Sequence, residues 1–308
     1  MSGPVTTQDT PPASEDGDPA AGPVVELEPG RVTEVGTMPV RRVLPHRPRR
    51  TVGAWCFADH VGPVATAGGG LGIGPHPHMG LQTVTWLVAG ELVHLDSLGS
   101  EQPIRPGQLN LMTAGRGVAH AEEDPGRARE LHGVQLWVAQ PEESRHGPPA
   151  FEHHGVLPVL ELEGAVATVL VGDFGGLESP ARRDTQHVGV ELAFGPPGSV
   201  LPLRRDYEHA LIVLEGSLRV DGEVVEPGVL AYLGGGRDEC RVDALEPGRA
   251  LLLGGVPFPE ALLMWWNFVA RTKEEVSEAR REWTAGTERF GTVRSHLDRI
   301  EVGPPPWE

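Results

Sequence analysis

The chain has 308 residues, enough for two domains of ordinary size, each with its own core. Its formal net charge of −17 produces a surface that repels phosphate backbones and anionic lipids, which argues against direct nucleic-acid or membrane binding. Glycine (41) and proline (30) are plentiful and aromatic residues make up only 5%, a balance that favours short strands and many turns over long helices.

The cysteines and the apolar segments predict a cytoplasmic protein. Cys56 and Cys240 lie far apart and form no paired framework, as is usual for an intracellular chain. The N-terminus shows no basic region followed by an apolar core, so no secretory signal is visible. The most apolar late stretch, residues 250–270, contains two prolines and a glutamate, which argues against a membrane span.

Residues 1–24 form an acidic, proline-rich segment. They include five prolines and four acidic residues but no lysine, arginine or aromatic residue. Such a segment buries too little apolar area to offset the entropy lost on ordering, so we expect a disordered tail.

From residue 25 onward the pattern is typical of strands. Residues 83–88, 133–138 and 210–214 are rich in β-branched and apolar residues, and the first and third run into a glycine turn. An internal repeat is also visible: residues 88–92 (VAGEL) resemble 214–218 (LEGSL), and residues 104–109 (IRPGQL) resemble 225–230 (VEPGVL). The sequence therefore predicts two related β-barrels.

One helix is expected near the C-terminus. Thr272 and Glu275 form a Thr-x-x-Glu capping box, Val276, Ala279 and Trp283 share one face, and a glycine at position 286 ends the pattern. We expect the apolar face to pack on a barrel; a partner-binding helix is the alternative.

Two short motifs carry donors for a transition metal. His76 and His78 are two residues apart, and His120 and Glu122 repeat that spacing, so in extended chain each pair projects to one face. If the two segments are neighbouring strands, four donors converge inside a barrel. Three imidazoles and one carboxylate suit Fe(II), Mn, Ni, Cu or Zn rather than Ca or Mg. The other histidines have no such pairing; we expect His94, His132 and His209 in core or supporting positions and most of the rest, among them His60 and His187, on the surface.

The segment from His76 to Glu122, HPHMGLQTVTWLVAGELVHLDSLGS followed by IRPGQLNLMTAGRGVAHAEE, resembles the signature of the pirin family. The upstream VRRVLPHRPRRTVGAWCFADHVGP and the downstream ELHGVQLWV and GGVPFPE are similar to pirin segments as well. The resemblance implies an all-β bicupin fold of two tandem β-barrel (cupin) domains with a short C-terminal helix. We expect the tail at 1–24, a metal-binding barrel at 25–145, and a metal-free barrel with the helix at 146–308.

The resemblance also implies one Fe(II) site, held by His76, His78, His120 and Glu122. Aligning the repeat places Pro202, Arg204, Arg241 and Asp243 at the corresponding positions of the second barrel, where a cationic arginine cannot ligate a metal. We therefore expect the second site to be lost.

Two functions follow from the resemblance. The first is a quercetin 2,3-dioxygenase-like enzyme that acts on a small aromatic, enolic substrate and dioxygen, with Glu122 as the catalytic proton acceptor. The alternative is an iron- or redox-sensing regulatory protein that binds a protein partner without turnover. Its expected contact surface is the basic stretch from Arg41 to Arg50, which is otherwise a solvated loop and strand entry.

Two residues depart from the family pattern. Met79 stands where an arginine is common, and Gln82 stands where a glutamate is common. We expect these differences to alter the charge and hydrogen bonding at the mouth of the pocket.

Overall fold

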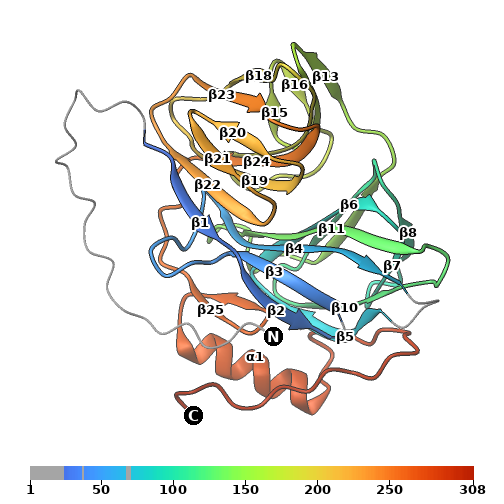
Figure 1. The fold of residues 1–308 in the computed structure, drawn as a ribbon. Coiled ribbons are helices and arrows are strands. Elements are labelled where there is room, and N and C mark those ends of the chain that lie inside the picture. Colours follow the sequence, from blue (N-terminus) through green and yellow to red (C-terminus); the bar gives the residue numbers. More distant parts are fainter. Residues whose placement is uncertain (1–23, 37, 67–70) are drawn as a thin grey trace.

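The structure, a computed structural model, describes residues 24–36, 38–66 and 71–308. The predicted tail at 1–24 lies outside the described residues, apart from its last residue. Strands dominate, and every strand pair in the sheets is antiparallel (Figure 1). No helix in the described part of the chain has the length and apolarity needed to cross a bilayer.

The first barrel consists of two sheets that face each other. The larger sheet has the strand order β12 (Ala150–His154), β9 (Leu109–Thr113), β6 (Leu81–Ala89), β11 (Glu130–Ala139), β4 (Trp55–Ala65), β3 (Met38–Leu44) and β2 (Arg31–Val35). The smaller sheet has the order β5 (Gly72–His78), β10 (Val118–Glu123), β7 (Leu92–Asp96) and β8 (Glu101–Ile104).

The second barrel repeats this arrangement. Its larger sheet has the order β1 (Glu26–Pro29), β22 (Val229–Gly234), β19 (Glu208–Glu215), β24 (Gly248–Gly255), β17 (His187–Phe194), β14 (Ala165–Val171) and β13 (Val159–Leu162). Its smaller sheet has the order β18 (Ser199–Pro202), β23 (Glu239–Ala244), β20 (Leu218–Val220) and β21 (Glu223–Val225). A short hairpin joins β15 (Asp173–Phe174) and β16 (Leu177–Glu178).

The sequence repeat corresponds to equivalent strands. The glycine turns at Gly90 and Gly216 end β6 and β19, and both glycines have positive φ, at 94° and 71°. The Pro-Gly turns that follow lead into β9 and β22. The prediction of two related barrels is confirmed.

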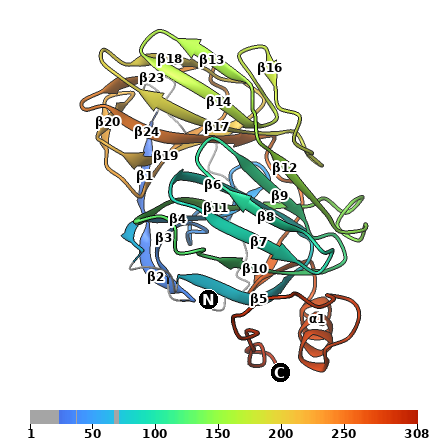
Figure 2. The ribbon, with the colours of Figure 1, turned by 90° about the vertical axis from the view of Figure 1, so that its right-hand side faces the viewer.

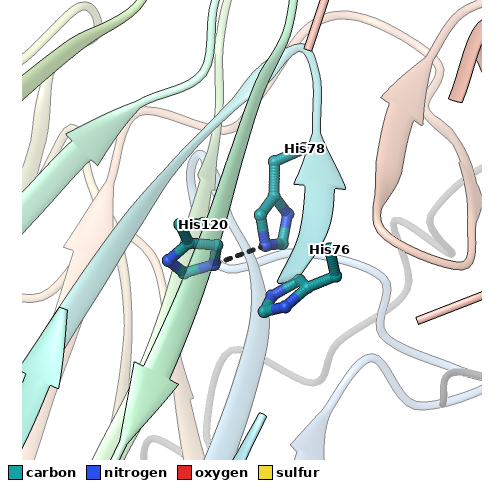
Figure 3. A group of neighbouring side chains, drawn as sticks. All are labelled: His76, His78 and His120. Carbon is teal, nitrogen blue, oxygen red and sulfur yellow. Dashed lines mark hydrogen bonds between the residues drawn. The ribbon is translucent and has the colours of Figure 1, made fainter. Parts of the chain in front are cut away.

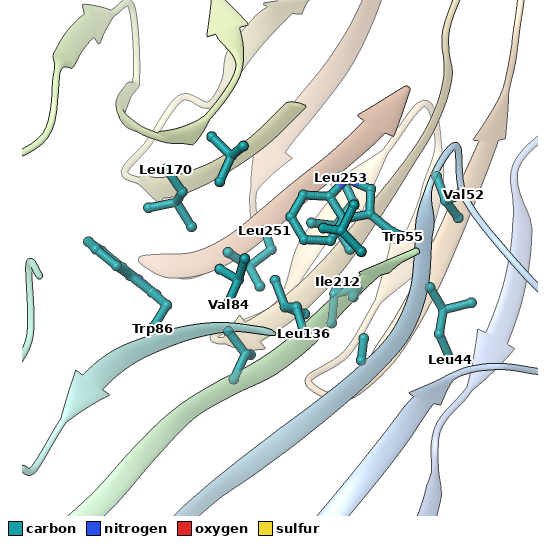
Figure 4. Packing of buried hydrophobic residues seen from close by; sticks show 14 of the residues in the cluster. Leu44, Val52, Trp55, Val84, Trp86, Leu136, Leu170, Ile212, Leu251 and Leu253 are labelled. Atoms are coloured by element: carbon teal, nitrogen blue, oxygen red, sulfur yellow. The ribbon is translucent and has the colours of Figure 1, made fainter. Parts of the chain in front are cut away.

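The two large sheets pack face to face through one apolar core. Trp55, Val84 and Leu136 from the first barrel meet Ile212 and Leu251 from the second, and all five are buried (Figure 4). The Trp55 indole Nε1 also donates across this core to the carbonyl of residue 188 at 3.0 Å. Burial of each large apolar side chain stabilises the fold by about 1.5–3 kcal/mol, so this contact fixes the barrels relative to each other.

Each barrel includes a strand from the other side of the predicted domain boundary at residue 145. Strand β1 pairs with β22 of the second barrel, and β12 pairs with β9 of the first. The hairpin of β25 (Leu263–Trp265) and β26 (Phe268–Ala270) and the helix α1 (Lys273–Ala285) lie beneath the first barrel (Figure 2). The division at residue 145 stays a prediction, but the strand pairing crosses it in both directions.

The helix has the predicted caps. The Thr272 side chain accepts from the Glu275 backbone N–H, and Gly286 ends the helix in the left-handed conformation. Val276, Ala279 and Trp283 are buried in a cluster below the first barrel. The predicted packing of this face on a barrel is confirmed.

Two histidines predicted to be exposed are buried. His187 is completely buried, and His60 lies in the first barrel with its Nε2 2.8 Å from Nε2 of His132. His132 Nδ1 in turn lies 3.2 Å from a Glu215 oxygen of the second barrel. The surface prediction is wrong because both residues lie on strand segments of the larger sheets that are buried on both faces, His60 on β4 and His187 at the start of β17.

This histidine pair predicts acid sensitivity. Burial lowers the pKa of His60 from 6.5 to about 4, so unfolding takes up a proton between those values. The contribution of this histidine to the free energy of unfolding should be complete above pH 6.5. It should fall as the pH drops toward 4, by up to about 1.4 kcal/mol per pH unit for each such histidine. Denaturant unfolding at pH 7.5 and 5.0 should show a smaller loss for His60→Gln than for wild type. A control, the exposed His146→Gln, should match wild type; equal losses in all three proteins would contradict the prediction.

Candidate metal centre

Strands β5 and β10 bring the two predicted motifs together. They pair antiparallel, with His120 opposite His76 and Val118 opposite His78. The alternating side chains of β5 place both of its histidines on the inner face, toward His120. The prediction that the two segments are neighbouring strands of one barrel is confirmed.

Three imidazoles converge on one buried point. The ligand nitrogens of His76, His78 and His120 all lie within 4.8 Å of one another, and the two Nε2 atoms of His78 and His120 are 3.0 Å apart (Figure 3). Each residue is at most 5% exposed. Among the described residues this is the one such group of three or more metal-ligating side chains.

Neighbouring groups hold two of these rings by their Nδ1 atoms. His76 Nδ1 lies 2.8 Å from the Gly74 carbonyl, which can only accept, so Nδ1 carries the proton and Nε2 keeps its lone pair. His120 Nδ1 lies 3.3 Å from His94 Nδ1, and His94 Nε2 lies 3.2 Å from a carboxylate oxygen of Asp96. One consistent set of protons runs from His120 to His94 to Asp96, and it also leaves the His120 Nε2 lone pair free. Metal-binding histidines are supported in this way.

Burial keeps the three rings neutral. It lowers the pKa of His76 to about 4, and burial together with the adjacent imidazoles lowers the pKa values of His78 and His120 well below the ordinary value. The neutral imidazole is the form that binds a metal, so the donor set fits a transition-metal ion.

Glu122 lies apart from the three histidines. It is not a member of the close group, and its Oε1 lies 3.4 Å from the Thr85 hydroxyl. The pairing of β5 with β10 shifts between His120 and Glu122, so that Glu122 stands opposite Ile73. This bulge gives β5 an extra residue and displaces Glu122 along the strand. Ligation of a metal by Glu122 stays a prediction.

Two of the three histidines and Glu122 face a largely apolar cavity between the two sheets of the first barrel. His76, His120 and Glu122 line it, and about 90 Å³ is open to the centre of a water-sized sphere, far more than one water needs. The remaining walls are mostly aliphatic and aromatic, including Phe57 and Trp137. A few polar groups in an apolar cavity are typical of a small-molecule site.

The last part of the chain completes this cavity. Trp266 and Asn267, from the turn between β25 and β26, line it, and so does Ile300. The Ile300 backbone N–H donates to the Pro75 carbonyl on β5 at 2.9 Å. Trp266 has a φ of 53°, an unusual value for a bulky residue, and such conformations cluster at functional sites.

Two polar residues of the cavity were missed by the sequence interpretation. Arg42 and Asp59 line it and form a buried bidentate ion pair, with nitrogen–oxygen distances of 2.8 and 2.7 Å. The basic stretch was expected to be solvated, but Arg42 is only 3% exposed. The alternation of buried Met38 and Val40 with exposed residues was the available signal, because it turns Arg42 inward.

The second barrel has an apolar interior at the corresponding place. Leu201, Cys240 and Val242 are buried within it. The residues aligned with the metal ligands mostly face outward: Pro202 and Arg241 are exposed, and Arg241 pairs with Asp243. The alignment of the two halves on their repeated turns therefore selected residues one position away from those whose side chains face the interior.

Met79 and Gln82 do not line the cavity. Met79 packs in the cluster beneath the barrel, where the Arg289 guanidinium contacts its sulfur at 3.3 Å. Gln82 is fully buried and donates to the Thr113 hydroxyl. The expectation that these two residues alter the pocket mouth is wrong, because their side chains face away from the cavity.

Comparison with known proteins identifies the family. Residues 37–138 match the Pirin family, and residues 196–291 match the Pirin C-terminal cupin domain. The chain belongs to the pirin family. This assignment agrees with the two-barrel architecture and confirms the predicted bicupin fold.

Individual pirin relatives are similar over nearly the whole chain. A Pseudomonas aeruginosa protein named "putative quercetin 2,3-dioxygenase" is 46% identical over 283 residues, which are 90% of each chain. A pirin-like protein of Caulobacter vibrioides is 36% identical over 90% of this chain and 97% of its own. The crystal structure of a quercetin 2,3-dioxygenase from Acinetobacter baumannii is 42% identical, with a TM-score of 0.89 over 92% of this chain and 96% of that one. With the histidine cluster, these similarities imply a metal cofactor.

Asp96 offers a test of the support behind His120. Burial raises the pKa of its carboxyl, but hydrogen bonds from His94 and Ser100 outweigh this and leave the pKa lowered, so Asp96 is an anion that holds His94. The Asp96→Asn change should weaken metal affinity by about 10- to 100-fold, because the amide no longer fixes the proton order of the two rings. Competition with a chromogenic chelator measures this. Asp173→Asn, at a surface ion pair of the second barrel, is the control. Equal metal affinities for the two variants would refute the role of Asp96 in fixing the His94 and His120 rings.

Proposed function

We propose that this pirin-family protein is an Fe(II)-dependent dioxygenase of the quercetin 2,3-dioxygenase type, acting on a planar aromatic substrate with an enolic hydroxyl. The observation that carries the proposal is the convergence of His76, His78 and His120, two of which (His76 and His120) line an apolar cavity together with the carboxylate of Glu122. The names of the Pseudomonas and Acinetobacter relatives support it. A cytoplasmic location stays a prediction.

The donor set suits the proposed metal. His76, His78 and His120 would hold it through Nε2, with Glu122 as a fourth ligand. Nitrogen donors with one carboxylate favour Fe(II), and Mn, Ni, Cu and Zn remain alternatives because affinity order and availability compete. When bound, Fe(II) supplies Lewis acidity toward the enol oxygen and one-electron chemistry toward dioxygen.

The protein's own groups bind and deprotonate the substrate. When it is not held by the metal, Glu122 accepts the proton of the enol hydroxyl, and burial, which raises the pKa of this carboxyl, makes it a better base. The Thr85 hydroxyl lies between Glu122 and Gln135 and orients the carboxylate. Phe57, Trp137 and the aliphatic walls hold the flat rings and exclude water.

Anaerobic loading with Fe(II), addition of quercetin and exposure to ¹⁸O₂ tests the proposal. We expect loss of the flavonol absorbance and a ring-opened product that contains both atoms of one dioxygen molecule. Metal-free protein serves as the control for spontaneous oxidation. Quercetin that stays intact, or that disappears equally fast in the control, would refute the activity.

The alternative of a partner-binding iron sensor gains no support from the basic stretch. Arg42 is buried against Asp59, and Arg49 pairs with Glu26 and Glu28 while its guanidinium lies over the Tyr232 ring. Two of the five arginines are thus engaged inside the chain. The enzyme is the function that the site favours.

A further inference from the structure

The wall of the cavity formed by the larger sheet carries a second polar group. Arg42 on β3 and Asp59 on β4 belong to that sheet, whereas His76 and His120 belong to the smaller sheet. All four residues line the same cavity, so a ligand inside it has the histidine cluster on one side and the Arg42 guanidinium on the other.

The guanidinium is held by one edge only. Nε and Nη2 of Arg42 donate to the two oxygens of Asp59, at 2.8 and 2.7 Å, and so form a bidentate contact along one edge of the guanidinium. Nη1 has no hydrogen-bond partner among the described residues, although it is buried. A buried donor without a partner is rare in a folded protein and marks a place where a ligand or water accepts its hydrogen bond.

The surroundings keep this donor in place. The guanidinium carbon lies 4.5 Å from the centre of the Phe57 ring, which fixes the plane of the group. Asp59 balances the positive charge, so the pair as a whole is neutral. A neutral pair with a free N–H donor suits a single hydroxyl, carbonyl, phenolate or carboxylate oxygen better than a multiply charged phosphate.

We propose that Arg42 is a specificity-determining residue that binds, through Nη1, an oxygen on the part of an aromatic substrate remote from the metal. Asp59 and Phe57 position the guanidinium. This inference rests on the proposed function for the identity of the substrate, and it defines the substrate class further: a planar molecule with an enol at one end and an oxygen substituent at the other.

The test compares two flavonols that share the enol. Quercetin carries hydroxyl groups on its remote rings, and 3-hydroxyflavone carries none. Binding to Zn(II)-loaded protein without turnover is followed by quenching of tryptophan fluorescence, since Trp137 and Trp266 line the cavity. Wild type should bind quercetin at least about tenfold more tightly than 3-hydroxyflavone, the discrimination expected when a buried donor loses its acceptor.

Two changes at position 42 test the residue itself. Arg42→Lys keeps a cation beside Asp59 and removes the planar fork with its free nitrogen. The double change Arg42→Met with Asp59→Leu replaces the buried ion pair by an apolar pair, which proteins often tolerate. Both should reduce the preference for quercetin to within about twofold and leave 3-hydroxyflavone binding unchanged. Arg49→Lys, at an ion pair outside the cavity, should behave as wild type.

A third ligand separates this inference from the proposed activity. Benzoate offers a single carboxylate on one ring and should bind metal-free wild type but not the two Arg42 variants. If flavonols bind with the same preference in wild type and in the variants, the role of Arg42 is overturned while the activity stands. If neither flavonol binds wild type, the proposed activity falls, and Arg42-dependent benzoate binding alone then supports the inference. Benzoate binding that ignores Arg42 would overturn it.

Discussion

Replacement of His78 by glutamine is expected to remove nearly all bound metal and all metal-dependent oxygen uptake. Its Nε2 is 3.0 Å from that of His120, so both lone pairs face the same point. Loss of a proposed direct ligand should exceed the roughly 10- to 100-fold effect of losing a supporting partner. Metal analysis after gel filtration, together with an oxygen electrode, measures both quantities.

A buried histidine of the other barrel provides the control for His78→Gln. His187 is completely buried, so His187→Gln disturbs packing to a similar degree without touching the cluster. It should keep the wild-type metal content. Equal metal content in the two variants would show that the three imidazoles do not form the metal site.

Much of the fold could be predicted because residues that are neighbours in the sequence determine its turns and helix ends. The glycine turns and the Pro-Gly turns recur at equivalent positions of both halves, and each repeat is one strand-turn-strand unit. The Thr272 cap and the Gly286 stop likewise depend on neighbours in the sequence. Local signals of this kind need no knowledge of distant contacts.

The exchange of segments between the barrels could not be predicted in this way. Strand β1 joins the second barrel, and Ile300 returns to the first, where it closes the cavity. Both contacts join residues about 200 or more positions apart along the chain. Strand pairing follows apolar surfaces and register, which a single segment does not encode.

The site was predictable in its histidines and less so in its carboxylate. His76, His78 and His120 follow from strand alternation once the two segments are taken as neighbouring strands, which the structure confirms. The position of Glu122 depends on the bulge in β5 between Ile73 and His76, where Gly74 and Pro75 are residue types that accompany bulges, a signal that the sequence interpretation did not use. Glu122 thus lines the observed cavity but lies outside the observed histidine cluster, although it was predicted to belong to that cluster.

This displacement leads to a separate expectation for Glu122. A residue that acts mainly as the proton acceptor should be needed for turnover more than for metal binding. Glu122→Gln keeps an oxygen donor of the same shape but cannot accept a proton. We expect kcat to fall by about 10²- to 10⁴-fold, with a smaller loss of metal affinity than in His78→Gln. Metal titration and steady-state oxygen uptake on the same preparations measure the two effects.

The adjacent residue on β10 makes this test specific. Glu123 accepts hydrogen bonds from Ser295 and pairs with His296, away from the cavity, so Glu123→Gln should retain wild-type turnover. In wild type, kcat/KM should fall on the acidic side as Glu122 becomes protonated, and this limb should vanish in Glu122→Gln. Burial raises the pKa of Glu122, so the limb should lie above the ordinary range of a glutamate unless the bound cation offsets it. A Glu122→Gln protein that loses metal as completely as His78→Gln would instead make Glu122 primarily a ligand, and one with unchanged turnover would remove it from the chemistry.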